Sequence, residues 1–402
     1  MNSKNVLLLL GLVILLFSYI IFNEKIKFSN SYNLNEVNIK NRNFKYINSS
    51  FPIENFIKLN DDFLICSSFQ YPKIFITKEY LSSQIEDGSL YLYNIKKDEL
   101  QKLQIENFPK NVPFHPHGIS LYKISDEKYY LFIINHSIKL DLEENEERIE
   151  KVLLTFDKKA ISLSFKNEIA LPKNFFGIIN SLAVIDLNTI YFTTKNYFPL
   201  PSFSYDNQNI KTYLNIAKYK LYDWLNVLFQ KLNLKKTYLY SYHWEKGKIN
   251  LISNSEGYSN HGLTYNREKT ILYMARPQEK DIKLFEISKN DPCKALLIET
   301  VKTMYNVANI IYDEQTEKIY AGIFGSTMEI INLENNYIKN GNFEEADTFG
   351  GFEEIDIKNN YEITDIILMK NGLKGVSSAI KMNKNIYLSS SYQNGLLIYF
   401  RK

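Results

Sequence analysis

The sequence predicts an all-β fold, a six-bladed β-propeller, and three observations support this prediction. Short apolar strands recur along the chain with turn residues between them. The chain has 402 residues, of which 45% are hydrophobic, so a closed repeat of sheets can use this length as one domain. Its 30 tyrosines and 26 phenylalanines favour pleated, half-buried surfaces.

Six hairpins begin in the same way, with a polar pair, an apolar strand, a turn and a returning apolar strand. The polar pairs are Glu54-Asn55, His117-Gly118, Asn180-Ser181, Asn260-His261, Ala308-Asn309 and Ser377-Ser378. The returning strands include residues 63–65, 130–132, 190–192, 271–273, 319–321 and 386–388. A closed repeat gathers the first residues of all inner strands in one place, which is where we expect an active site.

A third apolar segment follows each hairpin and is read as a third strand. These segments are residues 90–93, 153–156, 239–242, 283–286, 329–331 and 397–400. A four-stranded unit that repeats six times is typical of a propeller, and the irregular spacing indicates a divergent one. Asn23–Ser50 is read as a linker that can include an outer strand. Closure would then pair the C-terminal strand with strands near the N-terminus and remove the free edge.

The N-terminus carries a continuous apolar run, Val6–Phe22, with Lys4 before it and Lys25 and Lys27 after it. We interpret this run as an uncleaved signal anchor, a single transmembrane helix, in preference to a cleaved signal peptide, because no small-residue cleavage site follows. Residues 1–30 are therefore assigned to the anchor and its flank, and residues 31–402 to the propeller. Charge alone would keep the propeller in the cytoplasm, since the basic residues are more numerous after the run.

One insertion, at about residues 205–236, interrupts the strands. From Tyr213 to Leu232 its apolar residues recur with the spacing of an amphipathic helix, and five lysines surround them. Packing on the propeller rim is one interpretation. A basic helix that contacts a membrane or covers the site is the other.

Overall charge and cysteine content exclude several classes of function. The chain has 48 basic and 45 acidic residues, a formal charge of +3, which gives no indication of nucleic-acid binding. Its two cysteines, Cys66 and Cys293, form no CxxC pair, so neither a zinc ribbon nor a redox motif is expected. A disulfide between them stays open.

Two histidines are candidates for acid–base chemistry. His117 opens an inner strand, and His136 ends the returning strand of the same hairpin, so the two imidazoles can be neighbours. Such a pair can relay a proton, one ring activating water and the other passing the proton to solvent. The alternative is that each ring simply hydrogen-bonds to a loop carbonyl.

Three polar residues at the starts of inner strands are candidates for a metal site. Glu54, Asn180 and Asn309 supply a carboxylate and two side-chain amides, which are hard oxygen ligands suited to Ca²⁺. The alternative is that they line a water-filled channel.

The sequence resembles the paraoxonase/arylesterase family. The resemblance extends from about Phe51 to Lys402. The segments that carry it are residues 63–72 (FLICSSFQYP), 116–120 (PHGIS) and 134–136 (INH), with weaker matches at 180–182, 309–310 and 377–379. The resemblance implies a six-bladed propeller with two calcium ions in its tunnel, a His pair over the catalytic calcium, and hydrolysis of lactones and aryl esters. It also implies a secreted or membrane-anchored, extracytoplasmic protein.

Several residues match the family's site. His117 and His136 match the His pair and are the predicted catalytic residues. The predicted metal ligands are Glu54, Asn180 and Asn309, which match ligands of the catalytic calcium, together with Ile119, whose position offers a backbone carbonyl to the structural calcium, and His261.

Other positions depart from the family pattern. Ala308 stands where the family has an aspartate, and His261 stands where it has an asparagine unless a one-residue slip brings in Asn260. Asn55 and Ser181 replace the aspartates of the structural calcium. We therefore expect one weakened Ca²⁺ site. His261 could instead favour another divalent metal such as Zn²⁺ or Mn²⁺, since imidazole suits transition metals.

These observations predict a membrane-anchored arylesterase or lactonase that acts on a small-molecule ester or lactone through metal-assisted, His-activated water attack. The alternative is a non-catalytic propeller that has lost part of the calcium site and serves as a binding module. A sugar-lactone hydrolase of the related gluconolactonase kind shares the fold and stays open as well.

Overall fold

The computed structural model describes residues 36–37, 44–71, 86–137, 146–157, 160–172, 175, 177–197, 221–222, 225, 234–340, 348–369 and 373–400. By its internal contacts the chain divides into two units, Met1–Glu36 and Val37–Lys402, and the two-residue strand β1 (Glu36–Val37) spans their boundary. The predicted anchor, Val6–Phe22, and nearly all of the predicted insertion at 205–236 lie outside the described residues. In the part of the chain that is described, no helix is long and apolar enough to cross a membrane.

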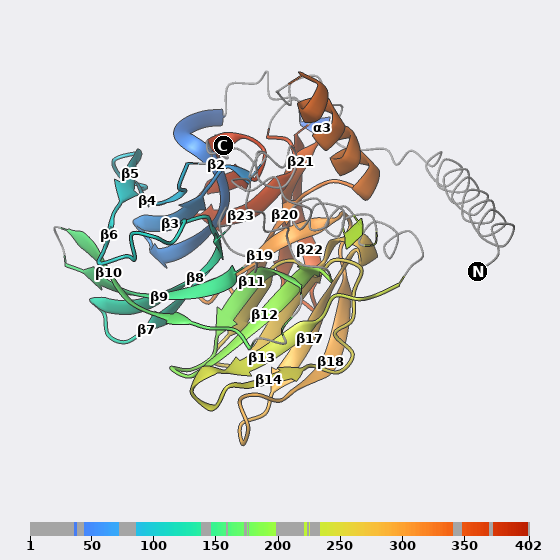
Figure 1. Cartoon of the computed structure of the whole chain (residues 1–402). Coiled ribbons are helices and arrows are strands. Elements are labelled where there is room, and N and C mark those ends of the chain that lie inside the picture. The colour runs from blue at the N-terminus through green and yellow to red at the C-terminus, as the bar shows by residue number, and fades with distance from the viewer. Residues whose placement is uncertain are drawn as a thin grey trace, which may run out of the picture. The chain divides into compact units, whose positions relative to one another are not determined.

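Mainly antiparallel sheets of one repeated design make up the second unit (Figure 1). The first of them contains β7 (Pro116–Lys123), β8 (Lys128–Ser137), β9 (Glu146–Phe156) and β10 (Ile161–Ile169), with the short β6 (Ile105–Glu106) paired in parallel beside β10. The next contains β11 (Ile178–Val184), β12 (Thr189–Asn196), β13 (Leu239–His243) and β14 (Lys248–Leu251). The one after that contains β15 (Leu263–Asn266), β16 (Ile271–Arg276), β17 (Asp281–Ile287) and β18 (Ala295–Lys302). A further sheet contains β19 (Val307–Asp313), β20 (Lys318–Ile323), β21 (Gly350–Asp356) and β22 (Glu362–Met369).

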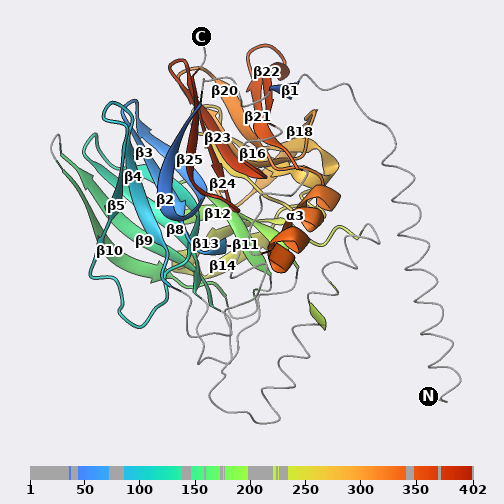
Figure 2. The same ribbon diagram turned by 90° about the horizontal axis from the view of Figure 1, so that it is seen from above.

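One long strand, β2 (Phe44–Asn60), joins the two ends of the second unit (Figure 2). Its first half pairs with β25 (Asn394–Phe400), and its second half pairs with β3 (Phe63–Ser68). The resulting sheet continues through β24 (Asn385–Ser390) to β23 (Val376–Met382) on one side and through β4 (Ser89–Asn94) to β5 (Glu99–Leu103) on the other. The predicted closure of the C-terminal strand onto a strand near the N-terminus is confirmed.

The first strands of successive units pack against one another in a closed ring, which gives a propeller-like arrangement. The ring runs through β2, β7, β11, β15, β19, β23 and back to β2. Neighbouring inner strands approach closely in it. A Cβ on Gly262 would lie 2.5 Å from the backbone nitrogen of Ile310 and 2.6 Å from Cα of Asn309, so only glycine is accommodated there.

The core lies between neighbouring sheets. Each interface is filled by apolar side chains of both sheets, so most inner strands are buried on both faces and read as continuous apolar runs. Four second strands place a buried tyrosine at their middle; these are Tyr191, Tyr273, Tyr320 and Tyr387. The predicted returning strands are thus confirmed as the second strands of the sheets.

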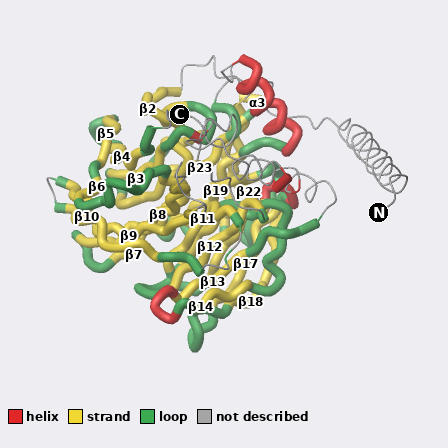
Figure 3. Tube along the Cα trace, in the orientation of Figure 1, coloured by secondary structure: helices red, strands yellow, loops and turns green. Residues whose placement is uncertain are grey.

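The prediction of a strand at residues 329–331 is wrong, because this segment lies in the helix α3 (Thr327–Asn340) (Figure 3). A capping box begins the helix: Ser326 Oγ accepts the Glu329 N–H, and Glu329 Oε2 accepts the Ser326 N–H. The third strand of this sheet is β21 instead. Among the described residues, two single-turn 3₁₀ helices, η3 (Trp244–Lys246) and η4 (Pro277–Glu279), connect strands. The buried thiols of Cys66 and Cys293 are not joined in a disulfide.

Candidate active site at the inner strands

The polar pairs of the repeat interrupt the strand ladders. The register between first and second strands skips Glu54 in β2, His117-Gly118 in β7, Asn180-Ser181 in β11, Ala308-Asn309 in β19 and Ser377 in β23. Such bulges turn side chains out of the sheet and are frequent beside active sites. The exception is Asn260-His261, which precedes β15.

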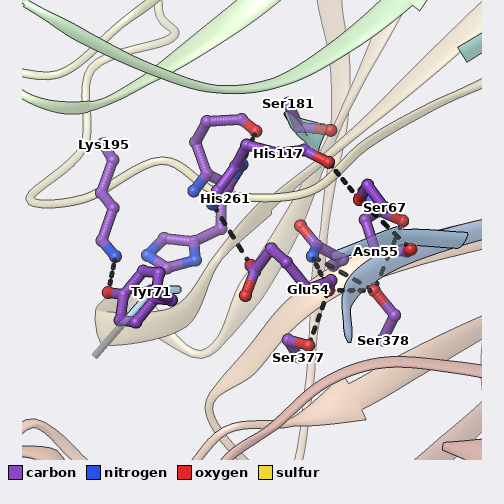
Figure 4. Close-up of polar contacts among 12 residues, drawn as sticks. Glu54, Asn55, Ser67, Tyr71, His117, Ser181, Lys195, His261, Ser377 and Ser378 are labelled. Atoms are coloured by element: carbon purple, nitrogen blue, oxygen red, sulfur yellow. Dashed lines mark hydrogen bonds and ion pairs between the residues drawn. The ribbon is translucent and has the colours of Figure 1, made fainter. Parts of the chain in front are cut away.

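His117 is the centre of the site (Figure 4). Its Nε2 lies 3.3 Å from Glu54 Oε1, and both side chains are at most 6% exposed. Its Nδ1 lies 2.8 Å from the backbone oxygen of Asn180. Because a carbonyl only accepts, the Nδ1 of His117 carries the hydrogen, and the lone pair of the neutral ring is on Nε2, facing Glu54.

His136 lies beside His117, as the sequence predicted. Their ring centroids are 4.9 Å apart with the rings inclined at 62°. Behind His136 is a residue that the sequence reasoning missed: Glu147 in β9, whose Oε1 and Oε2 lie 2.9 and 3.1 Å from His136 Nδ1. Glu147 Oε2 also accepts the backbone N–H of Ile179 at 3.2 Å.

Burial controls the ionisation of this cluster. Burial lowers the pKa of His117 well below its usual range, and the nearby His136 and Lys195 lower it further. Burial also lowers the pKa of His136, to about 3. It also raises the pKa of Glu54 to about 7 and that of Glu147 well above its usual range, although the Ile179 N–H opposes the rise in Glu147. Both imidazoles are therefore neutral at neutral pH.

Lys195, in β12, is the second residue of the candidate site that the sequence reasoning missed. Its half-buried ammonium donates to the Tyr71 hydroxyl at 2.7 Å (Figure 4). Burial acts to lower the pKa of Lys195, but Tyr71, Glu54 and Glu334 together raise it above its usual range. A permanent positive charge thus acts on Glu54 and on both imidazoles.

Three buried side-chain oxygens among the predicted ligands have no hydrogen-bond partner in the described part of the chain: Glu54 Oε2, Asn180 Oδ1 and Asn309 Oδ1. The amide nitrogen of Asn309 donates to the Ser378 hydroxyl at 3.2 Å, which leaves its oxygen as the unpaired end. Buried oxygens without donors suit a bound cation, and carboxylate and amide oxygens suit a hard one such as Ca²⁺. The described residues contain no cluster of three or more His, Cys, Asp or Glu side chains that could hold a metal ion.

The positions expected for a second ion are paired within the protein. Asn55 Oδ1 accepts the Ser378 hydroxyl at 3.4 Å, and Ser181 Oγ accepts the Leu263 N–H at 3.1 Å. Ser67 Oγ donates to the backbone oxygens of His117 at 2.5 Å and Asn55 at 3.3 Å. The side chains at the two positions where the resemblance implies aspartates are therefore already engaged in hydrogen bonds within the protein.

The remaining predicted ligands lie around this site, and their roles stay predictions. Ile119 pairs with Ile133 in the β7–β8 ladder and packs its side chain into the core. His261 is buried, with its Nε2 3.2 Å from the Ser259 hydroxyl and its ring beside Phe324. Asn260, the alternative to His261, donates its amide to the Ser255 backbone oxygen at 2.9 Å, and its Oδ1 has no partner among the described residues.

The sequence profile described as "Arylesterase" matches residues 60–222. The rabbit (Oryctolagus cuniculus) "Serum paraoxonase/lactonase 3" is 23% identical over 249 residues, which are 61% of this chain and 60% of the relative. The bovine (Bos taurus) "Serum paraoxonase/arylesterase 2" is 25% identical over 214 residues, 52% of this chain and 49% of the relative. The chain thus matches about three fifths or less of the length of these relatives.

Among solved structures, a luciferin-regenerating enzyme is similar, with 10% identity, coverage of 89% of this chain and 94% of that chain, and a TM-score of 0.48. The profile match includes His117, His136 and Asn180. The predicted resemblance is confirmed: the chain is related in sequence to the paraoxonase/arylesterase family.

Proposed function

We propose that this protein hydrolyses carboxylic esters or lactones at the inner strands of a six-bladed propeller. The observation that carries the proposal is the neutral His117, whose Nε2 faces a buried carboxylate with one unpaired oxygen. The relation to the arylesterase family supports the same class of reaction.

Two features of the fold support a count of six blades. Six first strands make the closed ring, and the two halves of β2 have different partners, β25 and β3. The seven-stranded sheet then represents two neighbouring blades that share β2, which closes the ring without a free edge.

The site would hold one divalent cation, Ca²⁺ by its ligand chemistry. Glu54 Oε2, Asn180 Oδ1 and Asn309 Oδ1 would bind it, and His261 is a candidate further ligand if the metal is Zn²⁺ or Mn²⁺. When bound, such an ion polarises the carbonyl of the ester. Ala308, which supplies no carboxylate, and the positive charge of Lys195 predict weak binding.

His117 would act as the general base. Its Nδ1–H is held by the Asn180 carbonyl, so Nε2 is the atom that takes a proton from the attacking water. The O–H bond of water breaks, an N–H bond forms on His117, and the hydroxide oxygen adds to the carbonyl carbon. The resulting imidazolium lies beside the Glu54 carboxylate, which stabilises its charge. The C–O bond between the carbonyl carbon and the leaving oxygen then breaks, and the leaving oxygen takes the proton from His117, so that an alcohol and a carboxylic acid result.

An apolar side chain shields the histidine pair from water. The Phe69 ring lies 5.8 Å from the His117 ring and 6.2 Å from the His136 ring, measured between centroids. A water-poor site strengthens the electrostatic interactions on which this reaction depends.

Membrane attachment is part of the proposal. Its basis is the apolar run Val6–Phe22, which would anchor the propeller by a single span. The family resemblance favours an extracytoplasmic propeller, whereas the flanking lysines by themselves favour the opposite orientation. The predicted amphipathic insertion would be a second contact with the membrane. Carbonate extraction of cell membranes tests it: the full chain should stay in the membrane pellet, and release into the supernatant would contradict an anchor.

The test of catalysis is the substitution His117→Gln, measured with phenyl acetate and a panel of lactones. Turnover should fall by roughly two to four orders of magnitude, the contribution of a general base. His243→Gln is the matched control, because His243 ends β13 outside the cluster described above. Unchanged turnover in a folded His117→Gln protein would contradict the role of His117, and a wild-type protein without hydrolysis would favour the binding module.

A further inference from the structure

Glu147 is a buried carboxylate that the reaction described above does not use. It lies at the start of β9, directly opposite His136 of β8 in the antiparallel ladder. Its side chain is 6% exposed and that of His136 is 1% exposed. Taking a carboxylate out of water is costly unless donors compensate, so a buried glutamate at this place requires an explanation.

Two donors hold the Glu147 carboxylate. One is the backbone N–H of Ile179, which reaches Oε2 at 3.2 Å. The other is on the His136 ring, whose Nδ1 is within 3.1 Å of both oxygens. The Ile179 N–H can only donate, so Oε2 is always an acceptor and only Oε1 could carry a proton. Burial raises the pKa of Glu147, while the Ile179 N–H lowers it and stabilises the carboxylate that accepts from both sides. A proton on Oε1 would instead donate to His136 Nδ1 and place the hydrogen of the ring on Nε2.

We infer that Glu147 is a positioning residue for His136, which fixes the hydrogen of the neutral ring on Nδ1 and leaves the lone pair on Nε2. This inference rests on the proposed function for its consequence, since His136 is the second imidazole of the proposed pair. A carboxylate behind an imidazole fixes the orientation of the ring and raises its basicity.

The surrounding contacts fix the His136 backbone as well as its ring. Its backbone N–H donates to the His115 oxygen at 3.2 Å, and its backbone oxygen lies 2.8 Å from His115 Nδ1. Phe69 packs against the ring. With the backbone held in this way, the orientation of the ring depends on what Nδ1 contacts, which is Glu147.

The substitution Glu147→Gln gives a sharp prediction because of Ile179. The glutamine side chain has one acceptor and one donor, and the Ile179 N–H requires the acceptor. The amide nitrogen must then face His136 Nδ1, which forces the hydrogen of the ring onto Nε2. Gln is close in size to Glu, so the variant changes the tautomer with little change in packing.

The experiment is ¹⁵N-histidine NMR on the full chain, with kcat and KM for phenyl acetate measured on the same samples. Five histidines give a spectrum that can be assigned, and His136→Gln identifies the His136 signals by their loss. The wild type should show His136 protonated on Nδ1, and Glu147→Gln should show it protonated on Nε2. Glu147→Gln should also lower kcat by roughly 10- to 100-fold with little change in KM.

Glu353→Gln is the matched control. Glu353 is a buried carboxylate of β21 that likewise accepts a backbone N–H, from Tyr305 at 2.7 Å, but it contacts no histidine among the described residues. It should leave the His136 tautomer and kcat unchanged. His136 protonated on Nε2 in the wild type, or on Nδ1 in Glu147→Gln, would overturn the inference. The NMR result decides it even if the wild type hydrolyses no ester, and that outcome would refute the proposed function alone.

Discussion

His117 Nε2 lies 3.3 Å from Glu54 Oε1, while the second oxygen of the same carboxylate has no hydrogen-bond partner among the described residues. One buried carboxylate thus faces the proposed base with one oxygen and leaves the other for a cation. The hydroxyls of Ser377 and Ser378 donate to the backbone oxygen of Glu54 at 2.7 and 3.1 Å. These hydrogen bonds hold Glu54 in place, both beside His117 and as a ligand of the proposed cation.

Replacing Glu54 by glutamine should abolish cation binding without unfolding the protein. The variant keeps the volume of the side chain and removes the only charge of the proposed ligand set. A unit charge near a cation contributes about 4 kcal/mol at the effective dielectric of a protein, so the affinity for Ca²⁺ should fall roughly a thousandfold. Isothermal titration with Ca²⁺ checks this. Equal affinity in Glu54→Gln and the wild type would rule out Glu54 as a ligand.

Replacing Lys195 by methionine should strengthen cation binding. The ammonium of Lys195 acts electrostatically on Glu54 and lowers the pKa of both His117 and His136. Its removal should tighten Ca²⁺ binding about tenfold, because nearby charges typically change each other's pKa by about one unit, which is a factor of ten in an equilibrium constant. Tyr71→Phe is the control, since it removes the hydroxyl that Lys195 contacts and keeps the charge. Weaker binding in Lys195→Met would show that Lys195 supports the site.

Affinity for the cation should depend on pH through Glu54. Burial raises the pKa of this carboxyl to about 7, so below that pH the group holds a proton and carries no charge. A cation must displace the proton, and its affinity should therefore fall roughly tenfold per pH unit below 7 and level off above 8. Titrations at pH 6, 7 and 8 test this. An affinity independent of pH would mean that Glu54 is ionised throughout or does not bind the ion.

The close approach of inner strands predicts a large effect of a single methyl group. Gly262→Ala would place its Cβ 2.5–2.7 Å from three backbone atoms of residues 308–310 and should cost about 3 kcal/mol of stability. Gly247→Ala is the control: it has a φ of 57° and no atom within 4 Å of the added Cβ, so backbone strain alone should cost about 1 kcal/mol. Urea unfolding compares them. A loss in Gly262→Ala no larger than in Gly247→Ala would contradict the packing of this ring.

The repeat was predictable because each unit carries the same two signals. The polar pairs mark where inner strands leave the ladder, and the apolar returning segments mark the second strands, four of which carry a buried tyrosine. The prediction of the third strand failed once, at residues 329–331 (EII). The two isoleucines were read as part of a strand, and the Ser326–Glu329 capping box that begins helix α3 was not considered.

Two residues of the site were not predictable from their surroundings in the sequence. Glu147 comes from an acidic stretch, residues 143–147, which reads as a solvated loop, and only the pairing of β8 with β9 brings it to His136. Lys195 lies one residue before the end of an apolar strand, where a lysine usually reaches solvent. Its electrostatic influence on Glu54 depends on the packing of separate sheets.

The most direct test of the account is the initial rate of ester and lactone hydrolysis by the purified full chain, measured with chelator and again after Ca²⁺ is restored. The account predicts hydrolysis that falls on chelation, returns with Ca²⁺, and is absent from His117→Gln under both conditions. A wild-type protein that hydrolyses no substrate of the panel with Ca²⁺ present, or at a rate equal to that of His117→Gln, would contradict it.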